Sequence, residues 1–325
     1  MERGSLSNNL DNVGNKLNIS EEYTEVICRS KSFTDLRSKA HHVQLRSTAI
    51  VSSSSSTIPS YTNILTGYLL EPEQHIITDM TKTSLLHHLI IEYFDGSFEA
   101  SKLCGFLLQN IHETRVNYSA IQRVIRLTKR VVVVNNSNNS FDDHDNIIPS
   151  YSTYHFSKHQ LAYNIFMELL SFIELSNPWA STNPILNFTL IRYKYKSMLN
   201  RLTVARDKME KMVKFMRLMR FYDVSMRRVH KQLDAAAKGV YILYRDLDTI
   251  ERLTRRLHDE VEHQKAIAAL CVKNKEVIIL KEVAREFKMH ESCFLKQIGE
   301  LEEHIYLCFL TINRSRRACY TINSI

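Results

Sequence analysis

The residues with the clearest chemical potential lie in one stretch, residues 208–231, which reads KMEKMVKFMRLMRFYDVSMRRVHK. Eight basic residues stand there against two acidic ones, a net charge of +6 in a chain whose formal net charge is +8. Met, Phe and Leu residues are interleaved with the cations. A basic amphipathic helix is typical of a segment that lies on an anionic membrane, where each cation contributes about 1 kcal/mol. The candidate membrane contacts are Lys208, Lys211, Lys214, Arg217, Arg220, Arg227, Arg228 and Lys231.

Two other interpretations of residues 208–231 stay open. A basic helix with Met and aromatic residues also resembles a calmodulin target. Alternatively, the stretch is an ordinary coiled-coil arm whose Met residues form the core and whose basic residues face water. Nucleic-acid binding is disfavoured, because the aromatic residues follow the spacing of a helical seam and do not form an exposed stacking platform.

Catalytic and nucleotide-binding motifs are absent from the sequence. It contains no G-x-x-x-x-G-K-[ST], G-x-G-x-x-G, G-x-S-x-G or H-E-x-x-H pattern. The best metal candidate is HDEVEH, with His258, Glu260, Glu262 and His263, but a closed zinc site needs four ligands in a fixed geometry. We interpret this cluster as a solvated helix face. We therefore predict no catalytic residue, no metal and no cofactor.

Composition favours an all-α fold. Only 7 Gly and 5 Pro occur in 325 residues, too few for the turns of all-β folds or the loops of nucleotide-binding folds. The six cysteines include no C-x-x-C pair, which favours reduced thiols packed as small hydrophobic residues. No run of about 18 apolar residues is present, so no plain membrane-spanning helix is expected. The first residues lack the apolar core of a secretory signal.

Two long heptad seams dominate the second half of the chain. They predict coiled-coil arms at residues 184–219 and 229–268, which fold back on each other as an antiparallel hairpin with its turn at Asp223–Ser225. The alternative is one continuous helix whose exposed seams would need an oligomer to cover them. The first seam is Phe188, Ile191, Tyr195, Met198, Leu202, Ala205, Met209, Met212, Met216 and Met219. The second is Val229, Leu233, Ala236, Val240, Leu243, Leu247, Ile250, Thr254, Leu257 and Val261.

The remaining segments complete the predicted architecture. Residues 1–60, rich in Ser and Asn, are expected to be a mostly disordered arm. Residues 61–134 form an N-terminal helical region, in which Asp95–Gly96 predicts a turn before a long helix. Residues 135–155 form a polar linker. Residues 156–325 hold the hairpin and the C-terminal helices, which we expect as one helix over 275–289 and another through Phe294–Ile312 that ends in basic residues.

Several motifs resemble a plant protein family of unknown function that includes integrin-like proteins. They are YLLEPEQ (68–74), EYFDGSFEASKLCGFLL (92–108), NPW (177–179), YILYRDLDTIERLTRRLHDEVEHQKA (241–266), LEEHIYLCFLTINRSR (301–316) and EEYTEVICRSKSF (21–33). The resemblance implies coiled-coil proteins, usually membrane-associated, without an established enzymatic activity. Similar family members carry a strongly apolar membrane segment between the two arms. Here residues 220–226 join the arms directly.

Three functional hypotheses follow. The first is a peripheral membrane or scaffold protein on the cytoplasmic side of a membrane, with protein partners on its helical faces. The alternative is a soluble cytoplasmic helical module that forms homo-oligomers through exposed seams. The third is an enzyme whose site is assembled from distant residues.

Overall fold

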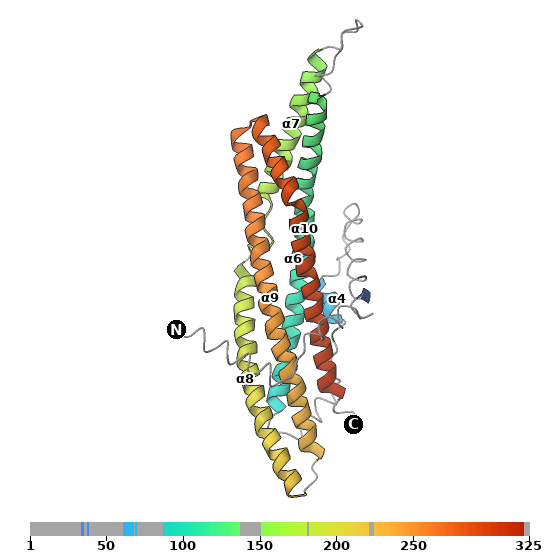
Figure 1. The fold of residues 1–325 in the computed structure, drawn as a ribbon, viewed down its shortest axis with the longest axis vertical. Helices are drawn as coiled ribbons and strands as arrows, with labels where there is room; N and C mark the ends of the chain where they lie inside the picture. Colours follow the sequence, from blue (N-terminus) through green and yellow to red (C-terminus); the bar gives the residue numbers. More distant parts are fainter. Residues whose placement is uncertain are drawn as a thin grey trace, which may run out of the picture. The chain divides into compact units, whose positions relative to one another are not determined.

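The computed structural model describes residues 34–35, 38, 61–67, 69, 87–136, 151–180, 182–220 and 224–321. Within these ranges the regular secondary structure is helical throughout, with no strand, which confirms the all-α prediction. The expected disordered arm, residues 1–60, lies almost wholly outside the described residues, and so does most of the expected polar linker. The helices are α4 (Tyr61–Gly67), α6 (His87–Asn136), α7 (Tyr151–Glu174), α8 (Thr182–Leu218), α9 (Val224–Asn274) and α10 (Val277–Thr321) (Figure 1).

The predicted turn at Asp95–Gly96 is wrong, because α6 runs through both residues. Gly96 serves a different purpose: it lets α6 approach α8 closely. A Cβ atom at Gly96 would lie 2.9 Å from Cε of Met198 and 3.8 Å from the hydroxyl of Tyr195. The glycine is therefore a contact point between two helices, and Asp-Gly is not a chain reversal here.

The predicted break between residues 289 and 294 is also wrong, since α10 is continuous over 45 residues. Polar contacts between side chains of neighbouring turns support the helix at this point. Lys288 Nζ lies 2.6 Å from Glu291 Oε2, and His290 Nε2 lies 3.0 Å from Glu286 Oε1. Such pairs at spacings of three and four residues each stabilise a helix by about 0.2–0.5 kcal/mol.

The chain reverses between α8 and α9, so the continuous-helix alternative is wrong. Arg220 takes a left-handed conformation, with φ of 59°, and its amide donates to the carbonyl of Arg217 at 3.2 Å. A left-handed residue after the last helical turn is a common way to end a helix. The two helices then run antiparallel and side by side (Figure 1), with Arg192 paired to Asp248 and Glu251, at 2.8 and 2.6 Å.

Two compact units can be distinguished in the chain, each built from discontinuous segments. Unit 1 takes the described residues up to Gln109, Thr182–Arg252, and those from Glu302 onward. It therefore contains α4, the first part of α6, all of α8, the first part of α9 and the last part of α10.

The four long segments of unit 1 each have antiparallel neighbours. Salt bridges join α6 to α8, as Glu99–Lys194 at 2.8 Å and Glu92–Arg201. On α10, Cys319 Sγ lies 3.7 Å from the carbonyl oxygen of Gln232 on α9. Together these contacts define an up-and-down four-helix arrangement.

Helices α9 and α10 approach each other closely at Gly239. A Cβ atom at this position would lie 2.6 Å from Cβ of Ser315. The hydroxyl of Tyr93, on α6, donates to Oγ of Ser315 at 2.5 Å. Three helices of unit 1 thus meet at one small residue, and a larger side chain could not be accommodated without a backbone shift.

Arg316, one of the basic residues expected at the end of the last helix, lies next to this contact and is buried. The residue is only 3% exposed. Its Nη1 donates to the carbonyl of Phe94 at 2.8 Å and to Oγ of Ser97 at 2.6 Å. The guanidinium carbon also lies 4.9 Å from the centre of the Phe94 ring. Hydrogen bonds and the ring together solvate the buried cation.

Unit 2 combines Asn110–Ser181 with Leu253–Leu301, that is, the rest of α6, α9 and α10 together with α7. The connection after α7 is anchored by Asn177, whose Nδ2 donates to Glu262 Oε1 at 2.7 Å and whose Oδ1 accepts from the Trp179 amide at 3.0 Å. Trp179 is fully buried. The rings of Tyr118 and Phe294 pack with centroids 4.7 Å apart. The NPW motif is therefore a structural element of this unit.

None of the described helices is both long and apolar enough to cross a bilayer.

The contact at Gly239 gives a direct test of the packing. We expect Gly239→Ala to lower the free energy of unfolding by about 1–3 kcal/mol, because the added methyl group meets Ser315. Gly299→Ala is the matched control: it is also helical, nothing lies within 4 Å of its Cβ position, and it should stabilise by about 0.4–1 kcal/mol. Denaturant unfolding followed by circular dichroism measures both. Equal stabilisation by the two substitutions would contradict the observed packing.

Candidate functional site

All eight predicted membrane-contact residues lie where α8 ends and α9 begins, a region named here the α8–α9 tip (residues 208–231). Lys208, Lys211, Lys214 and Arg217 are on the last turns of α8, and Arg220 is in the reversal. Arg227, Arg228 and Lys231 are on the first turns of α9. The chain reversal therefore brings together, at one end of a helix pair (Figure 1), cations that are up to 23 positions apart in sequence.

The tip also exposes large apolar side chains. Leu218 is 81% exposed and Phe215 60%, and Met212, Met219 and Val224 are exposed as well. The first predicted seam is thus buried only in part. Its positions Tyr195, Met198, Leu202 and Ala205 are buried, as expected, but Met212 and Met219 are not. The second seam is buried from Leu233 to Val261.

The seam opens because the neighbouring helices of unit 1 end earlier. α10 ends at Thr321, two residues after Cys319 contacts Gln232. α6 begins at His87, five residues before Glu92 pairs with Arg201. Of the described helices, only α8 and α9 themselves remain beyond these points. Two helices alone cannot cover an apolar stripe as four can, so the distal residues face outward.

Few of the cations at the tip are neutralised. Lys214 Nζ lies 2.6 Å from Glu210 Oε1, one turn earlier on α8, and this hydrogen-bonded cation lowers the pKa of Glu210. Lys211, Arg217 and Arg220 are exposed and form no ion pair with any residue that the structure describes. The tip therefore combines an uncompensated positive charge with an apolar surface.

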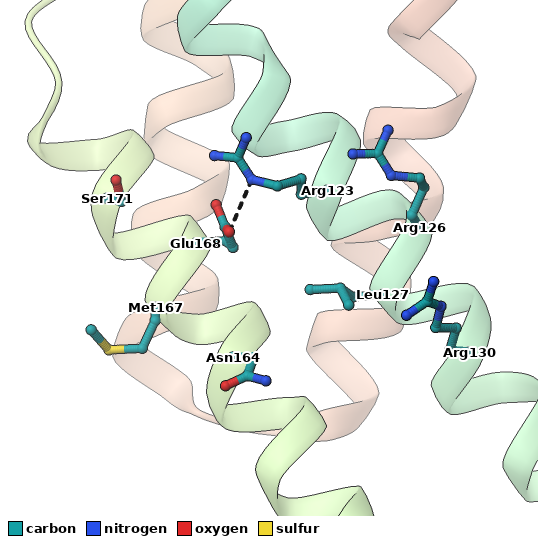
Figure 2. A pocket seen from close by; sticks show the side chains of 8 residues that line it. All are labelled: Arg123, Arg126, Leu127, Arg130, Asn164, Met167, Glu168 and Ser171. Atoms are coloured by element: carbon teal, nitrogen blue, oxygen red, sulfur yellow. Dashed lines mark ion pairs between the residues drawn. The ribbon is translucent and has the colours of Figure 1, made fainter. Parts of the chain in front are cut away.

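A second basic surface, which sequence reasoning missed, lies between α6 and α7 in unit 2. It is a groove of about 570 Å³ that Figure 2 shows from close by. The only ion pair drawn there joins Arg123 Nε to Glu168 Oε1 at 2.9 Å. Arg123, Arg126 and Arg130 follow one another at steps of three and four residues, which indicates one helix face and could have been noticed in the sequence. The residues of α7 that face them are known only from the fold. The groove is lined by Arg123, Arg126, Leu127, Arg130, Asn164, Met167, Glu168 and Ser171.

The HDEVEH cluster does not form a metal site among the described residues, where no group of three or more potential ligands is found. Its members have other partners. Glu262 accepts the hydrogen bond from Asn177, and His258 Nδ1 lies 3.1 Å from the Asp259 carboxylate. The described cysteines are reduced and, apart from Cys293, buried, in agreement with their predicted role as small hydrophobic residues.

Asp246, a half-buried acid of unit 1, has a raised pKa. Burial raises the pKa of Asp246 from 3.8 to about 7, and the nearby Arg245 lowers it only in part. Asp246 also acts on the thiol of Cys308, whose pKa is raised by a hydrogen bond with Cys104 and by burial. The Cys308 thiol is therefore not held as a reactive thiolate, because nucleophilic cysteines need a lowered pKa.

The chain is similar to proteins of two plants. UPF0496 protein At1g20180 of Arabidopsis thaliana is 31% identical over 364 residues, covering 93% of this chain and 89% of the relative. A rice protein (Oryza sativa subsp. indica) with the same family designation is 50% identical over 91 residues, 28% of this chain and 22% of its own. UPF0496 protein At3g19250 of Arabidopsis thaliana is 35% identical over 86 residues, 26% of this chain and 24% of its own.

No family model matches the chain. No solved structure matches it either. The first alignment spans 364 residues, more than the 325 of the chain, so the relative has residues in the aligned region that have no counterpart here.

The raised pKa of Asp246 predicts an unusual pH dependence of stability. Between about pH 4 and 7 its carboxyl stays protonated in the folded protein and ionises in the unfolded chain, so the free energy of unfolding falls as pH rises. Asp246→Asn should remove this slope and stabilise the protein at pH 8 by about 2–4 kcal/mol. Asp259→Asn, at a side chain 81% exposed, is the control and should leave the slope unchanged. Denaturant unfolding across this pH range tests the prediction, and an unchanged slope in Asp246→Asn would contradict it.

Proposed function

The chain belongs to the UPF0496 family of plant proteins, and because the names of its relatives state no activity, we propose a function from its surface. The protein binds anionic membranes peripherally through the α8–α9 tip and acts there as a non-enzymatic helical scaffold. One observation carries this proposal: exposed apolar side chains and uncompensated cations occur together at the tip.

The two kinds of residue support binding in different ways. Cations attract the protein to anionic lipid, at about 1 kcal/mol for each Lys or Arg near the surface. Phe215 and Leu218 then enter the boundary between headgroups and acyl chains, where full burial of such a side chain is worth about 1.5–3 kcal/mol. Penetration of this kind reaches only about 5–10 Å and requires no membrane-spanning helix.

The charge of the tip also favours one side of the membrane. The cytoplasmic leaflet carries the anionic lipids that give it a negative surface potential. A tip rich in Lys and Arg therefore favours a location on the cytoplasmic face. The other helical faces of the protein would remain in water, where they are available to protein partners.

A second candidate function, homo-oligomer formation, rests on another face of α8. Leu190, Tyr193 and Val204 lie on one side of this helix and are 66%, 73% and 54% exposed. Apolar residues at this spacing can pair with the same surface of a second copy. Light scattering separates the two candidates, since only the oligomer requires a mass above that of one chain without lipid.

Vesicle sedimentation tests the membrane proposal. The protein should sediment with vesicles that contain phosphatidylserine and not with pure phosphatidylcholine vesicles. Lys211→Glu, Arg217→Glu and Arg220→Glu combined should lower the affinity more than tenfold, because three attractive charges become repulsive. Salt at about 0.5 M should weaken binding sharply, since the screening length falls to about 4–5 Å.

The matched control reverses three exposed cations of unit 2, Arg256→Glu, Lys273→Glu and Lys296→Glu. The net charge changes by the same amount, so an effect of total charge would appear in both variants. The control should retain most of the binding. In a further variant, Phe215→Ser with Leu218→Ser should weaken binding although no charge changes. The proposal would be contradicted if the control lost as much vesicle binding as the tip variant. It would also be contradicted if the native protein bound neutral and anionic vesicles equally.

A further inference from the structure

The groove between α6 and α7, named here the arginine groove, is mostly polar and holds one apolar side chain on each wall, Leu127 of α6 and Met167 of α7. Arg126 and Arg130 belong to α6, and Met167 belongs to α7. Leu127 and the ion pair of Arg123 with Glu168 lie between the two helices (Figure 2). All of these residues belong to unit 2, whereas the α8–α9 tip belongs to unit 1.

The charges in the groove are unbalanced. Three arginines against one glutamate leave a net charge of +2. Glu168 is engaged by Arg123, while Arg126 and Arg130 are exposed and form no ion pair with any described residue. A ligand that neutralises this surface would carry two negative charges.

The spacing of Arg126 and Arg130 indicates which kind of anion the groove could bind. Residues four apart on a helix have Cβ atoms about 5–6 Å apart, so both guanidinium groups can reach one anion. Planar guanidinium forks suit the oxygen atoms of phosphate, to which each can donate two parallel hydrogen bonds. A phosphate monoester has three such oxygens and a charge near −2 at neutral pH.

The rest of the groove fits an organic group attached to that phosphate. Leu127 and Met167 provide apolar surface, and Met167 is 46% exposed. Met side chains adapt to irregular or aromatic groups. The volume of about 570 Å³ falls in the range of about 300–1,000 Å³ that small-molecule sites occupy.

We propose that the arginine groove binds a phosphate monoester attached to an apolar or aromatic body. Arg126 and Arg130 hold the phosphate, and Leu127 and Met167 contact the organic part. Two sources share this chemistry: a phosphorylated small molecule in solution, and the headgroup of a lipid such as phosphatidic acid. The inference does not depend on the α8–α9 tip, which belongs to a different unit.

Calorimetric titration of the full-length protein with phenyl phosphate tests the proposal. Arg126→Gln with Arg130→Gln should lower the affinity at least tenfold, since both phosphate partners are lost. Arg256→Gln with Lys296→Gln removes two exposed charges elsewhere in unit 2 and should change the affinity less than twofold. Phenyl sulfate, of similar shape with one charge fewer, should bind at least fivefold more weakly than phenyl phosphate.

A second variant tests the apolar contact of Met167 separately. Met167→Ser should lower the affinity for phenyl phosphate and leave the affinity for inorganic phosphate within twofold of that of the native protein. The substituted side chains are exposed, so every variant should keep the melting temperature of the native protein. A lowered melting temperature would reveal a variant that has lost its fold. Equal phenyl phosphate affinity in the native protein and the double arginine variant would overturn the proposal, as would equal binding of phenyl sulfate.

The two sources are distinguished with vesicles. If Arg126→Gln with Arg130→Gln weakens sedimentation with phosphatidic acid vesicles while phosphatidylserine binding persists, the groove recognises a lipid headgroup. If the double arginine substitution weakens only the binding of phenyl phosphate, the source is a soluble phosphate ester. The charge-reversed tip variant should still bind phenyl phosphate with native affinity, which separates failure of this inference from failure of the membrane proposal.

Discussion

The structure of unit 1 depends on one constraint, the need of two long apolar helix faces to leave water. Neither α8 nor the start of α9 could keep its seam buried alone, and the reversal at Arg220 lets the two helices cover each other. Burying a Leu or Ile side chain is worth about 1.5–3 kcal/mol, so a seam of several such residues outweighs the strain of one left-handed arginine. The same reversal gathers the cations of both helices at one end. The proposed membrane surface is thus a consequence of how the seam is buried and of where α6 and α10 end.

Polar contacts then fix which helix faces which. Ser315 meets Gly239 and the Tyr93 hydroxyl at a point where only small residues fit, and Arg316 is solvated by groups of α6. In unit 2, Asn177 plays a comparable part around the buried Trp179. Replacing one partner of such a contact leaves a buried polar group unsatisfied, which costs about 1–3 kcal/mol. Apolar burial makes these helices assemble, and the polar contacts give them one register.

Composition was enough to predict the all-α fold, and the apolar periodicity was enough to predict two long helices where α8 and α9 lie, since both depend on local sequence. These local signals failed where tertiary contacts decide. Gly96 is a turn signal by type, yet it is a packing residue because Met198 lies against it. The charge of Arg316 is typical of an exposed residue, yet Arg316 is buried. The spacing of Met212 is typical of a buried seam residue, yet Met212 is exposed, because the local pattern does not predict where neighbouring helices end. The arginine groove was missed for the same reason: its second wall comes from α7.

The central claim, that the tip enters the membrane surface, can be tested at a single side chain. The chain has one tryptophan, Trp179, which is fully buried in unit 2. Leu218→Trp therefore adds a reporter at the most exposed of the apolar side chains that the structure describes in the tip. Emission from the Leu218→Trp protein should shift to shorter wavelength with phosphatidylserine vesicles, and lipids brominated in their acyl chains should quench it. Neutral vesicles should cause neither change. If the protein sediments with anionic vesicles while this emission stays unshifted and unquenched, another surface makes the contact and the account is contradicted.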